Sequence, residues 1–347
     1  MTDTGRAIRL LKGERVDQTP LFPFILGFCA RNAGHPIATI YRDAEKSFEL
    51  QSWTHEQYGF DWGPLYGYAS YGTWEFGGEI KMPEGYEQAP SHTRFPVQSE
   101  ADIEKLGEPD PKTAGCLPTS MAFSRLQSAH GKPVSIVCAG NFTMAGNIAP
   151  VDKLCRWMLK KPELVHRIMR RVTDHIVKVV RYWCDTFAAD QVIPQMWEPL
   201  TANMIISPKQ FEAFVLPYMK ESSEKILAMG VRHILYHICG DQNKNLPLWA
   251  KIPTGEPGLC SFGREVDLLD AIRHLGENNI IVGNIDPQVF LGGPPDHIYD
   301  LCRVAIEKGK SAPRGFMLSS GCEIPPEAPP YHVHMMRKAI KDCGRNG

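Results

Sequence analysis

The 347-residue sequence has no excess of charge of either sign and no long hydrophobic run. It holds 38 Lys and Arg residues against 39 Asp and Glu residues, with no basic tract that could neutralise a row of phosphates. No stretch approaches the roughly 18 apolar residues of a membrane span, and the charged first residues are followed by no apolar signal core. We therefore expect no nucleic acid or membrane as partner and a cytoplasmic protein.

The sequence also lacks the motifs of disulfide scaffolds and of nucleotide-binding enzymes. Ten cysteines are spread from Cys29 to Cys343 with no Cys-x-x-Cys pair, which fits a reducing compartment better than a small secreted protein. No Gly-x-Gly-x-x-Gly follows an expected strand. In "CAGNFTMAG" (138–146) two glycines have the spacing of a phosphate-binding loop, but Asn147 stands where that loop needs Lys. A dinucleotide or phosphate-loop site is therefore not expected.

What the sequence does contain is an alternation of short apolar runs with longer helical segments, which is typical of parallel βα units. Strands are expected at 21–27, 60–66, 133–139, 190–196, 232–238, 258–262, 279–285 and 315–320. Helices are expected at 43–58, 118–130, 151–187, 207–229, 242–251, 266–275, 296–309 and 331–343. Eight strands with intervening helices favour a closed (β/α)₈ TIM barrel over an open doubly wound sheet. Residues 1–347 are expected to form this single domain, with an N-terminal extension.

One region does not fit a simple βα unit. Residues 67–100 are rich in Gly, Pro and aromatics, and we expect them to form a hairpin or lid over one end of the barrel. Residues 60–76 hold seven aromatics in seventeen positions with irregular spacing. Core packing explains some of them, and the irregular spacing favours an aromatic wall or lid that excludes water from the barrel mouth. Trp62, Tyr66 and Tyr68 are therefore candidates for contact with a substrate.

The stretch "HICGDQ" (237–242) places a histidine and a cysteine at the end of an expected strand. With 12 His and 10 Cys in 347 residues, a His-x-Cys arises by chance about 0.35 times, so the motif alone carries little weight. The position of the motif in the chain gives it more weight. In a strand, residues i and i+2 point to the same side, and the chemistry of a barrel lies at the carboxyl ends of its strands. His237 and Cys239 are therefore candidate zinc ligands, and a catalytic zinc needs a third.

The best candidate for that third ligand is Cys322 in "SSGCEIPPEAP", directly after the expected eighth strand. A His/Cys/Cys site would leave one tetrahedral position open for a substrate. Cys29, Cys138 and Cys260 also lie near strand ends, so this choice is not forced.

Polar residues near other strand ends are candidates for supporting roles. In "GNIDP" (283–287), Asn284 could hydrogen-bond a substrate or a metal ligand, and Asp286 could orient a ligand. Both are also ordinary turn formers before proline. Asn141 and Glu323 are further candidates for contact with the substrate.

Three segments together, "HICG" (237–240), "GNIDP" (283–287) and "LSSGCEIPPEAP" (318–329), resemble the uroporphyrinogen decarboxylase superfamily. They look most like its corrinoid-dependent branch, which includes methylcobamide:coenzyme M methyltransferases. The segments "EKLGEPDP" (104–111), "WMLKKPELVHRI" (157–168) and "ISPKQFEAFVLPYMK" (206–220) read like the same branch. The resemblance implies a TIM barrel, zinc bound by His237, Cys239 and Cys322, and transfer of a methyl group between a corrinoid and a thiol held on the zinc.

The resemblance leaves several alternatives for the reaction open. No Asp-x-His occurs in the chain, so the usual cobalamin-binding motif is missing and cobalamin is expected on a separate corrinoid protein. After Glu323 the chain reads "PPYHVHMM" (329–336), unlike the usual family pattern, which leaves a methoxylated or N-methylated donor open beside a thiol acceptor. A decarboxylase of the uroporphyrinogen type is the runner-up, since "RNAG" at Arg31 partly matches its arginine motif. A non-catalytic corrinoid-binding protein is the alternative from another class.

Overall fold

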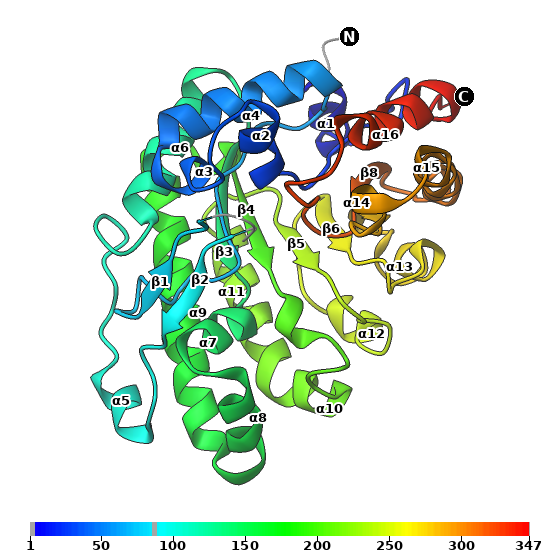
Figure 1. The fold of residues 1–347 in the computed structure, drawn as a ribbon. Coiled ribbons are helices and arrows are strands. Elements are labelled where there is room, and N and C mark those ends of the chain that lie inside the picture. The colour runs from blue at the N-terminus through cyan, green and yellow to red at the C-terminus, as the bar shows by residue number, and fades with distance from the viewer. Residues whose placement is uncertain (1–3, 85–88, 347) are drawn as a thin grey trace.

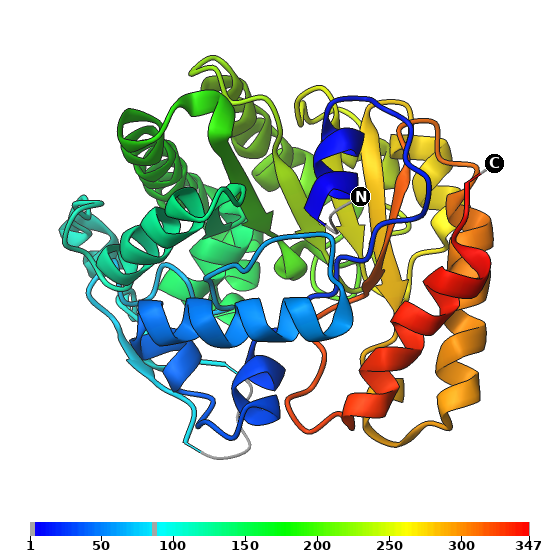
Figure 2. The same cartoon turned by 90° about the horizontal axis from the view of Figure 1, so that it is seen from above.

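The computed structural model describes residues 4–84 and 89–346, and its centre is a sheet of six parallel strands. The strands are hydrogen-bonded in chain order from β3 to β8. Their bounds are β3 Val134–Ala139, β4 Val192–Trp197, β5 Leu235–Ile238, β6 Gly258–Phe262, β7 Asn279–Ile285 and β8 Phe316–Ser320. All six are buried apart from one residue of β7, as expected for parallel strands covered by helices. Figures 1 and 2 show the helices arranged around these strands.

The first two expected strands, 21–27 and 60–66, are not strands in the structure. The first forms only an isolated parallel bridge from Leu21 to Leu318 of β8, and the second runs beside it, with the Asp61 N–H donating to the Leu21 carbonyl at 2.8 Å. Both contain a proline, Pro23 and Pro64, which has no N–H to donate to a ladder. The two segments still occupy the places of strands in an eight-membered barrel.

A buried carboxylate holds the N-terminal segments together. Asp61 is fully buried and accepts hydrogen bonds from the Leu21 N–H at 2.8 Å and from Arg6 at 3.3 Å. Arg6 lies on helix α1, so this ion pair ties the N-terminal extension to the barrel. The Leu21 N–H and Arg6 replace the water molecules that the Asp61 carboxylate loses on burial. The carboxylate therefore stabilises the fold only while both partners are in place.

Six of the eight expected helical segments each contain one helix, and the other two, 151–187 and 207–229, are divided. The α-helices are α1 Thr4–Leu11, α2 Gly27–Asn32, α3 Thr39–Arg42, α4 Ala44–Tyr58, α5 Glu100–Lys105, α6 Leu117–Ala129, α7 Asn141–Ile148, α8 Val151–Lys160, α9 Pro162–Thr186, α10 Pro208–Gln210, α11 Leu216–Leu227, α12 Leu246–Trp249, α13 Leu268–Leu275, α14 Val289–Gly292, α15 Pro295–Gly309 and α16 Pro330–Cys343. The expected helix 151–187 is divided at Lys161, because Pro162 begins a new helix. The expected helix 207–229 contains a π-helical turn at Phe211–Val215.

The hairpin expected within 67–100 is present. Strands β1 Glu79–Lys81 and β2 Ser91–Arg94 pair antiparallel. The segment before β1 packs on α7, where Asn147 donates from its side-chain amide to the carbonyls of Ala69 and Tyr71, both at 2.8 Å. Since α7 follows the carboxyl end of β3, the insertion lies toward the end of the barrel where the strands finish. No helix in the described residues is long and apolar enough to cross a membrane.

A second buried carboxylate fixes the insertion. Glu75 accepts hydrogen bonds from the Gly72 N–H at 2.7 Å and from the backbone and thiol of Cys116, both at 3.1 Å. Gly115 has a φ of +52° and passes so close that a Cβ there would lie 2.6 Å from a Glu75 carboxylate oxygen. The insertion and residues 115–116 are therefore packed with no room for a side chain between them.

Candidate metal centre

The structure brings His237, Cys239 and Cys322 together at the carboxyl ends of β5 and β8. Their ligand atoms all lie within 4.8 Å of one another. His237 is the penultimate residue of β5, Cys239 follows the end of that strand, and Cys322 follows β8 by two residues. His237 is buried and both cysteines are half-buried. Three residues from two distant segments thus converge on one point that stays partly open to solvent.

The orientation of the histidine leaves one ring nitrogen for a ligand. His237 Nδ1 lies 3.0 Å from the hydroxyl of Ser261, its register partner on β6. Nε2 is buried and has no hydrogen-bond partner in the part of the chain that the structure describes. A buried nitrogen without a partner costs free energy unless something else occupies its lone pair or proton. Asp286, a candidate for orienting a ligand, pairs with Arg264, and the group beside Nδ1 is the Ser261 hydroxyl.

The loops around the cysteines approach each other closely. A Cβ at Gly263 would lie 2.8 Å from the Gly240 nitrogen and 3.2 Å from the Cys239 Cα, so only glycine fits between the loops after β5 and β6. A hydrogen bond from the Cys239 thiol lowers the pKa of Cys322, with burial opposing and the His237 imidazole assisting. The same contact and burial raise the pKa of Cys239. The pair therefore favours one thiolate, the form of cysteine that binds metals.

Two aromatic rings flank the histidine. Phe24 lies edge-on to His237 with ring centroids 5.3 Å apart, and Trp197 lies edge-on at 6.3 Å. Trp197 is the register partner of His237 on β4. Phe24 and Trp197 also contact each other at 4.7 Å. These rings cover the imidazole on the barrel side and limit the access of water to it.

The donor set fits zinc. One imidazole nitrogen and two cysteine sulfurs are the ligands of zinc sites that keep a fourth position for substrate. The buried Nε2 without a partner and the Ser261 hydroxyl behind Nδ1 match the usual arrangement, in which a second group fixes the tautomer of a ligating histidine.

Two other residues expected near a substrate make contacts within the protein. Asn284 donates from its side-chain amide to the carbonyls of Gly263 and Val266, at 3.0 and 2.7 Å. Asp286 pairs with Arg264. The Asn284 amide thus holds the loop after β6, beside the metal centre.

The two remaining polar candidates are also engaged. Asn141 is buried, with its amide donating to Thr173 at 2.8 Å and its carbonyl accepting from Ser222 at 3.1 Å. Glu323, next to Cys322, accepts a hydrogen bond from the Gly27 N–H at 3.0 Å. Glu323 therefore ties the loop that carries Cys322 to the start of α2.

The aromatic stretch at 60–76 is mostly buried. Six of its seven rings are buried, and only Trp74 is exposed. The Tyr66 hydroxyl donates to the Tyr41 carbonyl at 2.9 Å, and the Tyr68 ring lies edge-on to Tyr41 at 6.1 Å. Core packing thus accounts for much of this stretch.

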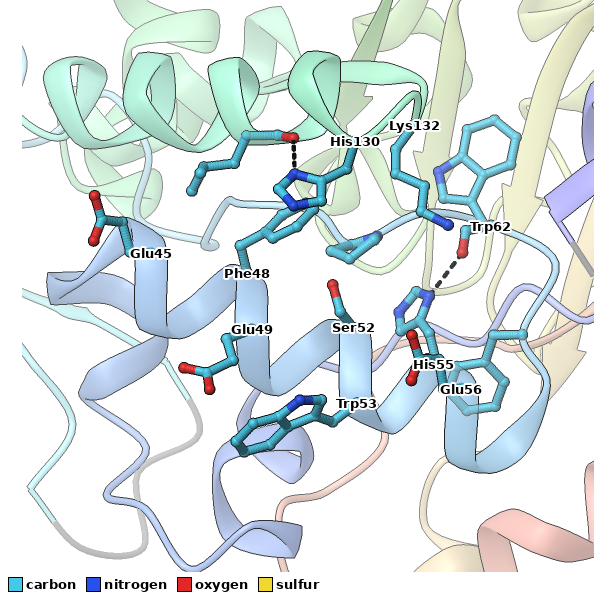
Figure 3. Close-up of a pocket in the computed structure, with 13 residues that line it drawn as sticks. Glu45, Phe48, Glu49, Ser52, Trp53, His55, Glu56, Trp62, His130 and Lys132 are labelled. Atoms are coloured by element: carbon cyan, nitrogen blue, oxygen red, sulfur yellow. Dashed lines mark hydrogen bonds between the residues drawn. The ribbon is translucent and has the colours of Figure 1, made fainter.

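Trp62 lies away from the metal centre. Its indole stacks on Phe22 at 4.8 Å and lines a cleft of about 790 Å³ between α4 and residues 130–132. Figure 3 shows this cleft, with His55 Nδ1–H donating to the Trp62 carbonyl at 2.7 Å. None of the three clustered ligands lines it. This cleft therefore lies apart from the metal centre.

The other cysteines near strand ends do not join the cluster. Cys29, Cys138 and Cys260 are fully buried, and burial raises the pKa of Cys29 and of Cys260 to about 12. Among the residues that the structure describes, only His237, Cys239 and Cys322 form a group that could hold a metal ion.

The fold and the cluster together define a barrel of parallel strands with a histidine and two cysteines at their carboxyl ends. Residues 2–343 match the family model of uroporphyrinogen decarboxylase (URO-D). The chain therefore belongs to the URO-D family.

Relatives with two different activities are similar to the chain. A methylcobamide:CoM methyltransferase from Methanosarcina acetivorans is 26% identical over 349 residues, covering 98% of both chains. A uroporphyrinogen decarboxylase from Myxococcus xanthus is 26% identical over 266 residues, covering 73% of this chain and 71% of that one. A solved structure of a methyltransferase from Methanosarcina mazei superposes with a TM-score of 0.84 at 21% identity, covering 99% of both chains. This last likeness establishes the URO-D-like barrel fold.

Proposed function

We propose that the chain is a zinc-dependent methyltransferase that moves a methyl group between a corrinoid protein and a small substrate. The observation that carries the proposal is the convergence of His237, Cys239 and Cys322, whose ligand atoms lie within 4.8 Å of one another. The similarity to a methylcobamide:CoM methyltransferase over 98% of both chains supports it.

Each residue of the centre has a role that follows from its contacts. His237, Cys239 and Cys322 would hold the zinc, and Ser261 keeps the imidazole in the tautomer that leaves Nε2 free. Bound zinc supplies a Lewis acid that lowers the pKa of a thiol or polarises a methylated heteroatom. Phe24 and Trp197 shield the imidazole from water on the barrel side.

The cobalamin is proposed to arrive on a partner. The chain contains no Asp-x-His, so the usual motif for holding cobalamin within the same chain is missing. The corrinoid protein would dock at the carboxyl ends of the strands, where the half-buried cysteines lie. The substrate is either a thiol acceptor or a methoxylated or N-methylated donor.

The decarboxylase alternative requires several guanidinium groups aimed at a substrate with many carboxylates. Arg31, which partly matches the decarboxylase motif, lies 3.9 Å from the Glu327 carboxylate. An arginine next to a carboxylate of its own protein is less able to neutralise one on a substrate. No structural observation favours decarboxylation over methyl transfer.

Metal analysis tests the centre. The purified protein is expected to contain about one equivalent of zinc, and Cys322→Ala is expected to lose most of it because one of three ligands is removed. Cys260→Ala is the matched control, since Cys260 is buried on β6 outside the cluster. Less than about half an equivalent of zinc, unchanged by Cys322→Ala, would contradict the proposal.

Absorption spectroscopy of cobalt tests the reaction. The protein is mixed with methylcobalamin and a panel of thiols, and separately with cob(I)alamin and methoxylated aromatics. Methyl transfer is expected to change the cobalt bands in one panel. Loss of carboxyl groups from uroporphyrinogen, with no change in either panel, would favour the decarboxylase instead.

A further inference from the structure

A small cavity lies inside the barrel beside His237. It measures about 20 Å³, which is room for about one water-sized group. Its lining consists of inward-facing residues: Phe22, Phe24, Leu65, Gln195, Trp197, Leu235, His237, Ser261 and Ser319. Trp197, His237 and Ser261 form one row across β4, β5 and β6, and Gln195 and Leu235 form the row two residues earlier. The cavity therefore extends from the row of the metal ligand into the barrel.

Apart from His237 Nε2, the polar group in this lining that has no partner in the described part of the chain belongs to Gln195. Its side chain is 2% exposed, and its Nε2 has no hydrogen-bond partner among the residues described. The two serines in the lining do have hydrogen-bond partners. Ser261 contacts His237 Nδ1, and Ser319 donates to the Ser320 carbonyl at 3.0 Å.

An unmade hydrogen bond of this kind destabilises the folded state. A buried amide at this position is consequently expected to find its acceptor in whatever fills the cavity. Because His237 lines the same cavity, that occupant lies beside the metal centre.

We propose that Gln195 binds the substrate by donating a hydrogen bond from its amide to the heteroatom that gives up or receives the methyl group. The inference rests on the proposed methyltransferase function and specifies the substrate at that site. An N–H aimed at this atom also favours the negative charge that a thiol or alcohol carries without its methyl group or proton.

The lining also limits the class of substrate. It contains four apolar or aromatic side chains besides Trp197 and no Lys, Arg or carboxylate. A charged group such as a carboxylate or sulfonate would be desolvated there without a counter-ion. The reacting end is therefore a small, uncharged thiol, thioether or methyl ether, and any charged part of the substrate stays outside the cavity.

Nuclear magnetic resonance can observe this amide directly. Zinc-loaded protein is prepared with ¹⁵N-labelled glutamine, and the side-chain signal of Gln195 is identified by its loss in Gln195→Met, which keeps a similar length and volume. Ethanethiol, dimethyl sulfide and methanol are the probes. At least one is expected to shift the Gln195 signal saturably, and ethanesulfonate at the same concentration is expected to leave it in place.

Affinity provides the second readout. The probe that shifts the signal is titrated into wild-type protein and Gln195→Met by calorimetry, and the variant is expected to bind about tenfold more weakly, as for one lost hydrogen bond. Zinc content is expected to be equal in both, because Gln195 is not among the clustered ligands.

The outcomes separate the inference from the proposed function. If methyl transfer proceeds while no probe moves the Gln195 signal, the cavity holds only water and the inference is overturned. A saturable shift with no methyl transfer in any assay supports the binding site and refutes the methyltransferase. If neither is observed, both proposals fail.

Discussion

Removing the Ser261 hydroxyl tests how the metal centre is oriented. In Ser261→Ala, His237 Nδ1 loses its 3.0 Å contact, and the ring is free to rotate or to adopt the other tautomer. Partners of this kind typically contribute 10–100-fold to metal affinity, which corresponds to about 1.4–2.7 kcal/mol. The upper part of this range is expected, because His237 is buried and, among the residues that the structure describes, its Nδ1 has no hydrogen-bond partner other than Ser261.

Competition with a chromogenic chelator gives the zinc dissociation constants of wild-type protein and Ser261→Ala. Ser319→Ala is the matched control, because this buried hydroxyl lines the same cavity and bonds the Ser320 carbonyl rather than His237. The zinc affinity of the control is expected to stay within about twofold of the wild type. Equal affinities for wild type and Ser261→Ala would refute the view that this hydroxyl fixes the imidazole.

Three further predictions concern stability, each measured by urea unfolding. Burial raises the pKa of Glu198 from 4.5 to about 7. The protonated side chain therefore makes its full contribution to stability below about pH 4.5, and this contribution is lost as the pH rises through about 7. Between about pH 5 and pH 8, the free energy of unfolding of the wild type should fall by up to about 3 kcal/mol relative to that of Glu198→Gln. Parallel pH profiles would contradict this. Asp61→Ala should cost about 1–3 kcal/mol, because it leaves the buried Leu21 N–H without its acceptor while Arg6 keeps its pair with Asp17; a cost near zero would rule out the proposed tie. Gly115→Ala should destabilise more than Gly34→Ala, since both have positive φ but only the first would contact the buried carboxylate of the insertion; equal costs would exclude that contact.

The strands of the second half of the chain were predictable because each is a short, buried, apolar run. The expected strands 258–262 and 279–285 coincide with β6 and β7, and β3, β4, β5 and β8 begin or end within a few residues of expectation. The first two expected strands differ because Pro23 and Pro64 interrupt the ladder. Apolar periodicity indicates burial in both cases, and it does not report whether a backbone N–H is available.

Helix α7 was not predicted for a related reason. All eight of its residues, Asn141–Ile148, are buried. A helix that is covered on all sides has no polar face, so it lacks the three- or four-residue alternation by which a surface helix is found. Its sequence, "NFTMAGNI", contains Gly and Asn, which have low helix propensity. Glu198 compensates by accepting hydrogen bonds from the Phe142 and Thr143 N–H groups at the start of this helix.

The three clustered residues could be predicted from position along the chain, whereas Ser261 and Gln195 depend on how strands are paired. A residue at a strand end is placed by that strand alone. The contact of Ser261 with His237 follows from the register of β5 against β6. This register cannot be read from the sequence of either strand alone. A weaker signal was nevertheless present in the sequence. Strands buried on both faces are nearly continuous in apolar residues, so the polar residue inside "VIPQMW" (192–197) and that inside "GLCSF" (258–262) each required a partner within the barrel. Such residues identify the interior side of a site before its geometry is known.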